Sequence, residues 1–255
     1  MSHLQVEGLS ISFGGLRAVH DLSFTVAKSS IFGLIGPNGA GKSTVFNCIS
    51  RLYQPDSGRI TFEGNDLLAC QAHELAGLGV GRTFQNIELF DGASLLSNLM
   101  TAQFSLSRTG LFSELLYLPP VRRQEVAFRQ KAEEMIDFFE LAHYRHEIVG
   151  RLPYGVRKVA EIARSLCLSP GILLLDEPSS GLNQEETDDL SHQILDIRDR
   201  LDTTVLLVDH NMNLIEQVAD EIVAMAQGEG ITSGPVNEVI RHPEVLRAYL
   251  GEDHG

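Results

Sequence analysis

Residues 34–44 restrict the fold more than any other part of this sequence. They read LIGPNGAGKST, which places glycines and a Lys-Ser pair at the spacing G-x-x-x-x-G-K-[ST] directly after an apolar run. This is the spacing of a phosphate-binding loop between a strand and a helix. Gly36, Gly39 and Gly41 accept backbone angles that a Cβ forbids, so successive N–H groups can turn inward around a phosphate. The sequence therefore predicts a nucleotide-binding loop here.

The side chains and the following helix add to this prediction. Lys42 supplies a positive charge, and a helix beginning near it contributes N–H groups and the positive end of its dipole. The hydroxyl of either Ser43 or Thr44 is suited to ligate Mg²⁺. A glycine-rich turn before an ordinary helix is the alternative, which the expected strand and helix disfavour. The loop residues predicted to bind the nucleotide are Gly36, Pro37, Asn38, Gly39, Ala40, Gly41, Lys42, Ser43 and Thr44.

Size, charge and cysteine content narrow the class of protein. With 255 residues, 43% of them apolar, the chain can bury a core as one large domain or as one domain with an inserted lobe. Its formal charge of −14 argues against a general affinity for nucleic acid or anionic lipid. Cys48, Cys70 and Cys167 are too scattered for a disulfide framework, which fits a reducing cytosol. We expect no signal peptide and no membrane-spanning segment, so that any membrane role comes through a partner.

The apolar pattern predicts a β layer beside an α/β core, with a helical lobe inserted. Alternation over residues 4–26, broken at Gly14-Gly15, indicates antiparallel strands. Between residues 86 and 150 the β signal gives way to helical spacing. Elsewhere we expect strands at 31–35, 59–62, 80–84, 171–175 and 203–208. We expect helices at 42–52 and 156–168 and a short helix ending at Leu250. A hairpin is expected with strands 222–225 and 231–232 and a turn at 228–230.

Two carboxylates follow the buried strand at 171–175. Its continuous apolarity marks a strand covered on both faces, and open α/β sheets place their ligands at the carboxyl ends of such strands. Asp176 is placed to hold Mg²⁺ directly or through water. Glu177 projects differently and is placed to polarise a water in line with a γ-phosphate. Two exposed loop carboxylates are the alternative interpretation.

Phe13 has two possible interpretations, which the sequence alone does not distinguish. It sits at the end of a predicted strand shortly before the glycine loop, where its ring would stack on adenine. Packing into the core is equally consistent with its position.

Taken in order, these features resemble the ATP-binding subunit of an ABC transporter over nearly the whole chain. The resemblance identifies Gln85 as the glutamine of the Q-loop and His210 as the switch histidine. It also matches Phe13 to the adenine-stacking aromatic and residues 36–44 to Walker A. Leu152-Pro153-Tyr154-Gly155 corresponds to the signature. Residues 173–178 correspond to Walker B with its catalytic glutamate, and residues 179–183 to the D-loop.

This resemblance implies an α/β fold of the P-loop NTPase (ABC ATPase) type, with a RecA-like core, an antiparallel β subdomain and an inserted helical subdomain. The whole chain, 1–255, would form one ATP-binding domain. Residues 1–85 and 151–255 would form the core and β subdomain, and residues 86–150 the helical subdomain.

The resemblance also implies a mechanism in which two ATP-binding subunits face each other head to tail. Each ATP would lie between the Walker A loop of one chain and the signature, with Tyr154 and Gly155, of the other. Lys42 would bind the β- and γ-phosphates, Glu177 would activate water, and His210 would contact the γ-phosphate. Ser43, Gln85 and Asp176 would arrange Mg²⁺. Further implied partners are multi-span permease subunits and, indirectly, a solute-binding protein, at the cytoplasmic face of the inner membrane.

Several details are similar to the Liv-type subunits that energise import of branched-chain and other hydrophobic amino acids. These include Gly81-Arg82-Thr83-Phe84-Gln85-Asn86, the Leu-Pro-Tyr-Gly signature and the ending Ala248-Tyr249-Leu250-Gly251. Alternatives are a urea or amide importer, an exporter of the lipopolysaccharide type, a soluble ABC ATPase and a P-loop kinase. Kinases have no signature, D-loop or switch histidine. Soluble ABC ATPases usually carry two cassettes or long coiled-coil insertions, which this chain lacks.

The signature departs from the common pattern at two positions. Pro153 replaces the usual serine and has neither a hydroxyl nor a backbone N–H to offer a phosphate. Val156 replaces the glutamine that often follows the motif. We therefore expect this signature to close on ATP more weakly than a serine version, unless proline is usual in this subfamily.

Overall fold

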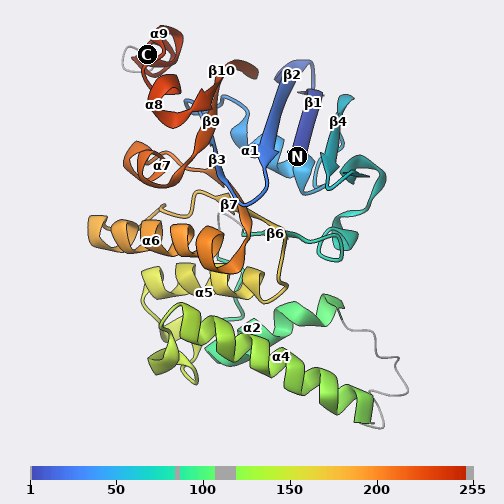
Figure 1. Cartoon of the computed structure of the whole chain (residues 1–255), viewed down its shortest axis with the longest axis vertical. Helices are drawn as coiled ribbons and strands as arrows, with labels where there is room; N and C mark the ends of the chain where they lie inside the picture. The colour runs from blue at the N-terminus through green and yellow to red at the C-terminus, as the bar shows by residue number, and fades with distance from the viewer. Residues whose placement is uncertain (1, 84–86, 107–118, 251–255) are drawn as a thin grey trace.

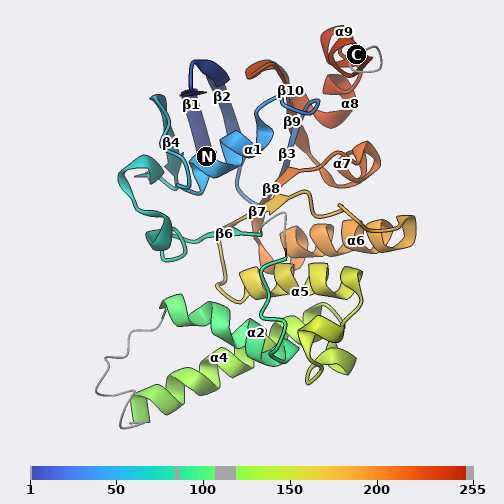
Figure 2. The same cartoon turned by 180° about the vertical axis from the view of Figure 1, so that it is seen from behind.

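The computed structural model describes residues 2–83, 87–106 and 119–250. Within them an antiparallel sheet lies beside a mostly parallel one (Figures 1 and 2). Alternating burial over residues 22–27 shows why the first sheet forms, because every second residue of that stretch faces the core. This sheet has the order β2-β1-β4-β5 and comprises β1 (Ser2–Phe13), β2 (Leu16–Ala27), β4 (Ser57–Phe62) and β5 (Asn65–Asp66).

The second sheet has the order β10-β9-β3-β8-β7-β6, and its neighbours are parallel except for the β9–β10 hairpin. Every residue of β3, β7 and β8 is buried, as expected for strands covered on both faces. The strands are β3 (Ile31–Ile35), β6 (Val80–Arg82), β7 (Ile172–Asp176), β8 (Thr204–Val208), β9 (Glu221–Ala226) and β10 (Glu229–Pro235).

The register of this sheet decides where the site lies. Leu34 in β3 pairs with Val208 in β8, and Val208 pairs with Asp176 in β7. Because the three strands are parallel, the segments that follow them leave from the same edge of the sheet. The glycine loop, Glu177 and His210 are therefore brought to one place by the order of the strands.

The helices cover this sheet in layers. Figure 1 shows α5 and α6 between the sheet and a lower layer that contains α2 and α4. The α-helices are α1 (Lys42–Ile49), α2 (Leu95–Ala102), α4 (Pro119–Phe138), α5 (Tyr154–Leu166), α6 (Gln184–Leu201), α7 (Met212–Val218), α8 (Val236–Val239) and α9 (Pro243–Leu250). Short 3₁₀ helices span Leu67–Ala69, Ala72–Glu74, Gln103–Leu106, Ala142–Tyr144 and Val149–Arg151.

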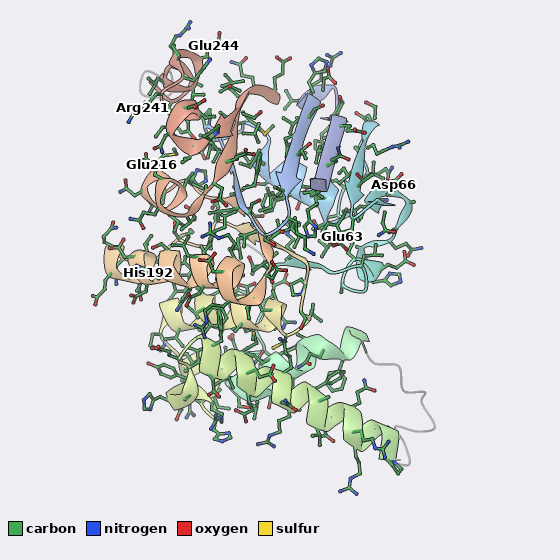
Figure 3. The ribbon with its side chains drawn as sticks, in the orientation of Figure 1. Glu63, Asp66, His192, Glu216, Arg241 and Glu244 are labelled. Atoms are coloured by element: carbon green, nitrogen blue, oxygen red, sulfur yellow. The ribbon has the colours of Figure 1, made fainter. Side chains whose placement is uncertain are left out.

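Many charged side chains lie on the outside of these layers. Asp66, His192, Glu216 and Arg241 are exposed and project from the surface in Figure 3. In the described part of the chain, no helix is both long enough and apolar enough to cross a bilayer.

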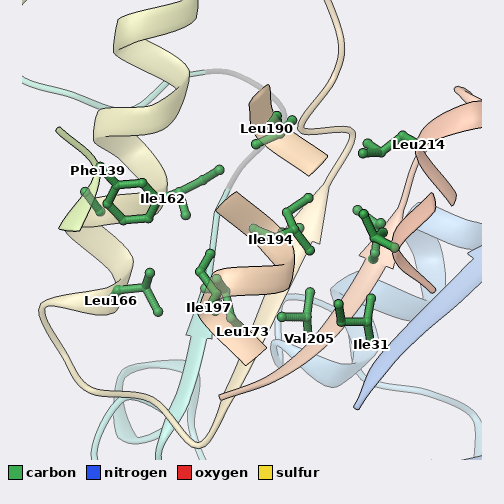
Figure 4. Close-up of a cluster of buried hydrophobic side chains, with 14 of the residues drawn as sticks. Ile31, Phe139, Ile162, Leu166, Leu173, Leu190, Ile194, Ile197, Val205 and Leu214 are labelled. Carbon is green, nitrogen blue, oxygen red and sulfur yellow. The ribbon is translucent and has the colours of Figure 1, made fainter. Parts of the chain in front are cut away.

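Two apolar clusters form the interior. One joins the helical layers to the parallel sheet. In Figure 4 Phe139 lies beside Ile162, and Ile194 and Ile197 lie near Leu173 and Val205. The other fills the space between the two sheets and around α1. Both clusters include residues of the parallel sheet, so the positions of the loop and of α5 are fixed against the same scaffold.

Several predicted boundaries shift for local reasons. Helix α1 ends at Ile49 rather than 52, where Arg51 takes a positive φ of 60°. Helix α5 begins at Tyr154 rather than 156, because Pro153 stands at the N-cap position with extended ψ. Strand β6 is described as far as Arg82, and the predicted positions Phe84 and Gln85 lie outside the described residues. The β9–β10 turn falls at residues 227–228 rather than 228–230, and both have positive φ.

Candidate nucleotide-binding site

Two glycines of the loop are required by close backbone approach. A Cβ on Gly36, whose φ is 151°, would lie 2.2 Å from the carbonyl oxygen of Met225. A Cβ on Gly41, whose φ is 100°, would lie 2.4 Å from the carbonyl oxygen of Ala18. Gly41 is also the N-cap of α1 and offers no side-chain cap, so the first N–H groups of that helix stay available to an anion.

Lys42 is folded over the loop that precedes it. Its Nζ donates to the carbonyl oxygens of Gly36, at 2.6 Å, and Pro37, at 2.9 Å. The residue is only 5% exposed, so its ammonium is held near the loop instead of extending into solvent. A phosphate in the loop would meet this positive charge together with the helix N-terminus.

A cavity of about 460 Å³ opens beside the loop. Of the predicted nucleotide-binding residues, Asn38 through Thr44 line it, and so do Glu177 and His210. Gly36 and Pro37 are not among its lining residues. The remaining wall consists of Leu16, Arg17, Ala18 and Gln227, which the sequence reasoning missed.

Those missed residues come from two hairpins. Residues 16–18 begin β2 after the Gly14-Gly15 turn, and that glycine pair was a signal for a hairpin close to the loop. Gln227 lies in the β9–β10 turn with a φ of 51°. No sequence signal marked it, because it reaches the cavity only through the packing of that turn against Ala18.

Glu177 and His210 form a hydrogen-bonded pair in this cavity. Nε2 of His210 lies 2.7 Å from Oε1 of Glu177. Glu177 has a left-handed φ of 50°, which is strained for a residue with a side chain, and its N–H donates to the carbonyl of Val208. This backbone bond fixes the first residue after β7 against the end of β8.

Asp176, the last residue of β7, is buried and does not line the cavity. Its Oδ2 accepts a hydrogen bond from Nη2 of Arg82 at 3.0 Å. Burial raises the pKa of Asp176 above its ordinary value, and the guanidinium of Arg82 offsets part of that rise.

Asp209 is a further carboxylate that orders the segments around the cavity, and the sequence reasoning gave it no role. It is buried and accepts hydrogen bonds from the backbone N–H of Ser179 at 2.9 Å and from its hydroxyl at 2.6 Å. It also accepts from the N–H of Asn211 at 2.9 Å. Its place directly after a buried strand was the available signal. The segment after Glu177 and the segment carrying His210 are therefore joined.

Phe13 lies outside the cavity lining and outside the core. It is 45% exposed, and its ring meets that of Tyr53 edge to face at 5.1 Å between centroids. The core-packing interpretation is therefore wrong, whereas adenine stacking remains a prediction. Gln85, the predicted ligand of Mg²⁺, is outside the described residues.

Residues 152–155 contribute nothing to the lining of this cavity. Tyr154 is 46% exposed, and its hydroxyl donates to the carbonyl of Ser180 at 3.3 Å. A Cβ on Gly155 would lie 2.5 Å from Oε1 of Glu186, so this glycine lies close to the side chain at the start of α6. Tyr154 and Gly155 thus stand apart from the glycine loop of their own chain.

The oxygen donors near the loop fit Mg²⁺. No group of three or more His, Cys, Asp or Glu side chains placed to hold a metal occurs in residues 2–83, 87–106 and 119–250. Mg²⁺ needs no such group, since it is commonly held by one or two protein oxygens, phosphate oxygens and water. The hydroxyl of Ser43 and the carboxylate of Asp176 provide oxygens of this kind.

The glycine loop after β3, the carboxylate at the end of β7, which β8 separates from β3, and the Glu177–His210 pair define a P-loop nucleoside triphosphatase. Comparison with known families refines this class. Residues 19–180 match the family model described as ABC transporter.

Relatives and a solved structure agree with that match. The chain is 40% identical over 98% of both sequences to the high-affinity branched-chain amino acid transport ATP-binding protein LivG of Salmonella typhimurium. It is 34% identical, over 99% of this chain and 98% of the relative, to the lipopolysaccharide export system ATP-binding protein LptB of Haemophilus influenzae. The ADP conformation of an ATP-binding cassette of an ABC transporter superposes with a TM-score of 0.86 at 28% identity, over 98% of this chain and 99% of that one.

The chain therefore belongs to the ABC transporter family and is one of its ATP-binding cassettes. As a member it is an ATPase coupled to transport. The predicted family and fold class are confirmed.

Proposed function

We propose that ATP and Mg²⁺ bind in the cavity beside residues 38–44 and that Glu177 and His210 carry out hydrolysis there. The observation that carries this proposal is that the 2.7 Å Glu177–His210 pair lines the same cavity as a glycine loop with a buried lysine. A carboxylate in this position accepts a proton from the attacking water. His210, held against Glu177, contacts the γ-phosphate and registers its loss.

The remaining roles follow from position. Lys42 and the loop amides stabilise the β- and γ-phosphates, and the helix dipole of α1 adds to their field. Ser43, Gln85 and Asp176 hold Mg²⁺, which when bound neutralises charge that develops on the phosphate oxygens. Phe13, exposed at the end of β1, is the residue we assign to stacking on adenine.

A second ATP-binding subunit completes the site. The support is the position of the signature, because Tyr154 and Gly155 begin helix α5 yet do not line the cavity of their own chain. A helix N-terminus attracts phosphate, and the N-terminus of α5 does not face the cavity of its own chain. We therefore place it on the nucleotide of a sister ATPase or of a second copy of this chain.

The unusual signature sets the strength of that contact. Pro153 is the N-cap of α5 and makes no side-chain cap, so neither a hydroxyl nor an N–H at this position reaches a phosphate. Tyr154, the N–H of Gly155 and the helix dipole remain. Closure on ATP is accordingly weaker than with serine.

Branched-chain or related hydrophobic amino acids are the solutes we propose. Support comes from the 40% identity to LivG, against 34% to the export protein LptB, each over nearly the full length. The signature Leu152-Pro153-Tyr154-Gly155 favours the importer as well. Export of lipopolysaccharide and import of urea or amides are the alternatives.

The proposed assembly is peripheral. The chain docks through its helical part and the region near Gln85 onto multi-span permeases at the cytoplasmic face of the inner membrane. A solute-binding protein delivers the solute on the other side, and nucleic acid is not a partner.

The test is co-purification followed by transport. The chain is expressed with the permeases encoded beside its gene and incorporated with them into liposomes, and ATP-dependent uptake of labelled leucine is measured in the presence of the binding protein. Uptake that is lost in Lys42→Ala supports the proposal. Recovery of an intact complex that moves no amino acid would contradict the solute assignment and leave the ATPase assignment intact.

A further inference from the structure

Arg82 connects three elements around the nucleotide-binding loop. It ends β6, and its side chain is 10% exposed. Nη2 donates to Oδ2 of Asp176 on β7 at 3.0 Å. Nη1 donates to the hydroxyl of Ser50 and, at 3.5 Å, to the carbonyl oxygen of Phe46, both at the end of α1. The guanidinium therefore ties the carboxylate of Asp176 to the helix that begins at the glycine loop.

The backbone of Arg82 is fixed as well. Its carbonyl oxygen accepts a hydrogen bond from the hydroxyl of Ser165 on α5 at 3.0 Å. The neighbouring Thr83 N–H donates to the carbonyl of Leu174 at 2.9 Å. Both ends of the Arg82 side chain are thus anchored, so the carboxylate it holds has a defined orientation.

In this arrangement the hydrogen bond from Arg82 reaches Oδ2 of Asp176 and not Oδ1. Within the described residues the side-chain interaction of Asp176 is made through Oδ2, and Oδ1 takes no part in it. A carboxylate has only two side-chain torsions, so a bond that fixes Oδ2 also fixes Oδ1. The planar fork of arginine is suited to this task because it donates in two directions from one rigid group.

We propose that Arg82 is a positioning residue for the metal site: it holds Asp176 through Oδ2 so that Oδ1 stays oriented for Mg²⁺. The proposal rests on the proposed role of Asp176 as a metal ligand. Arg82 contacts Asp176 and, like Asp176, is not among the cavity residues, so it acts through Asp176, which holds Mg²⁺ directly or through a water.

Two other roles for the pair predict different results. A purely structural ion pair would affect the stability of the fold without changing metal affinity. A guanidinium that competes with the metal for Asp176 would weaken metal binding, and its removal would tighten that binding. The positioning role alone predicts weaker metal binding when Arg82 is changed.

The experiment uses Mn²⁺ as the probe with a non-hydrolysable ATP analogue and the full chain. Free Mn²⁺ is measured by electron paramagnetic resonance for wild type, Arg82→Lys, Arg82→Met and Arg164→Met. Arg164 is the matched control because its Nη1 donates to the carbonyl of Glu88 at 2.6 Å and it has no contact with Asp176 in the described structure. Analogue binding without metal and thermal unfolding are followed in parallel.

We expect Arg82→Met to weaken Mn²⁺ affinity about tenfold or more, the scale on which groups that orient metal ligands act. Arg82→Lys should fall between it and wild type, while Arg164→Met and metal-free analogue binding stay unchanged. If Arg82→Met does not fold, Arg82→Lys against wild type decides. Unchanged or tighter Mn²⁺ binding in the folded Arg82 variants overturns this inference and leaves the proposed function intact. A wild-type chain that binds no Mn²⁺ with the analogue overturns the proposed function and the inference with it.

Discussion

Nε2 of His210 and Oε1 of Glu177 are 2.7 Å apart, although the two residues are 33 positions apart and follow different strands. The contact depends on the parallel pairing of β7 with β8, which puts Asp176 opposite Val208. It also depends on the left-handed backbone of Glu177, whose N–H donates to Val208. The Glu177–His210 pair is therefore a consequence of strand order and one strained residue.

Replacing His210 with alanine removes the partner that holds Glu177. We expect ATP turnover to fall by about 10² to 10⁴, the range for loss of a group that assists proton transfer, with nucleotide affinity within a few-fold of wild type. Turnover is measured by phosphate release and affinity by a fluorescent ATP analogue. His192→Ala is the control, since His192 is exposed on α6 (Figure 3) and should leave turnover unchanged. Equal turnover in the two variants would remove His210 from the mechanism.

Replacing Pro153 with serine should strengthen ATP-induced association of two ATP-binding subunits. A hydrogen bond to a charged phosphate contributes about 1.5 to 3 kcal/mol, which corresponds to roughly tenfold to a hundredfold in the dissociation constant. Association is measured by analytical ultracentrifugation with ATP. Pro153→Ala is the matched control, because it restores the N–H without the hydroxyl. No change in either variant would show that this position does not face a phosphate.

The two loop glycines Gly36 and Gly39 should differ in their tolerance of alanine. At Gly36 a methyl group would meet the Met225 carbonyl at 2.2 Å in addition to a strained φ, so we expect a loss of about 2 to 4 kcal/mol in the free energy of unfolding. At Gly39 the φ is 75° but nothing lies within 4 Å, so about 1 kcal/mol is expected. Urea unfolding of the two variants measures the difference. Equal losses would mean that the close approach of residue 225 is absent in solution.

The three cysteines provide a prediction about the chemical reactivity of their thiols. Burial raises the pKa of Cys48 to about 11 and that of Cys167 to about 12, so both stay protonated in the folded chain at pH 8. We expect a disulfide reagent such as dithionitrobenzoate to modify only the less buried Cys70 in the native protein and all three cysteines in denaturant. Rapid native modification of three thiols would contradict the packing around α1 and α5.

The raised pKa values of Cys48 and Cys167 also determine whether the free energy of unfolding rises or falls with pH. Above about pH 9 the unfolded chain releases these two thiol protons while the folded chain retains them, so the unfolded state binds fewer protons. The contribution of these groups to the free energy of unfolding therefore falls as pH rises from about 9 towards 11. In Cys48→Ala/Cys167→Ala this part of the alkaline loss should disappear, as measured by urea unfolding at several pH values.

The sequence predicted the parts of the site that depend on short stretches of chain. Residues 36–44 have the spacing typical of a loop whose backbone surrounds a phosphate. Asp176-Glu177 follows a run of apolar residues that only a doubly covered strand requires. Both signals are local, and so is the helix start near residue 154, which was missed by two positions only because proline took the N-cap.

What the sequence did not reveal depends on contacts between distant segments. Arg82 meets Asp176 across 94 positions, and no periodicity predicts which arginine becomes buried. Gln227 and residues 16–18 line the cavity because two hairpins pack against each other near Ala18. The environment of Phe13 depends likewise on Tyr53, which lies beyond the end of α1.

The most direct test of the central claim is a comparison of ATP binding, subunit association and hydrolysis in Glu177→Gln, with Glu185→Gln on the exposed start of α6 as the control. We expect Glu177→Gln to bind ATP with wild-type affinity and to accumulate as an ATP-bound dimer, while hydrolysis falls by about 10² or more. Glu185→Gln should behave as wild type. Full turnover in Glu177→Gln would contradict the assignment of the catalytic site.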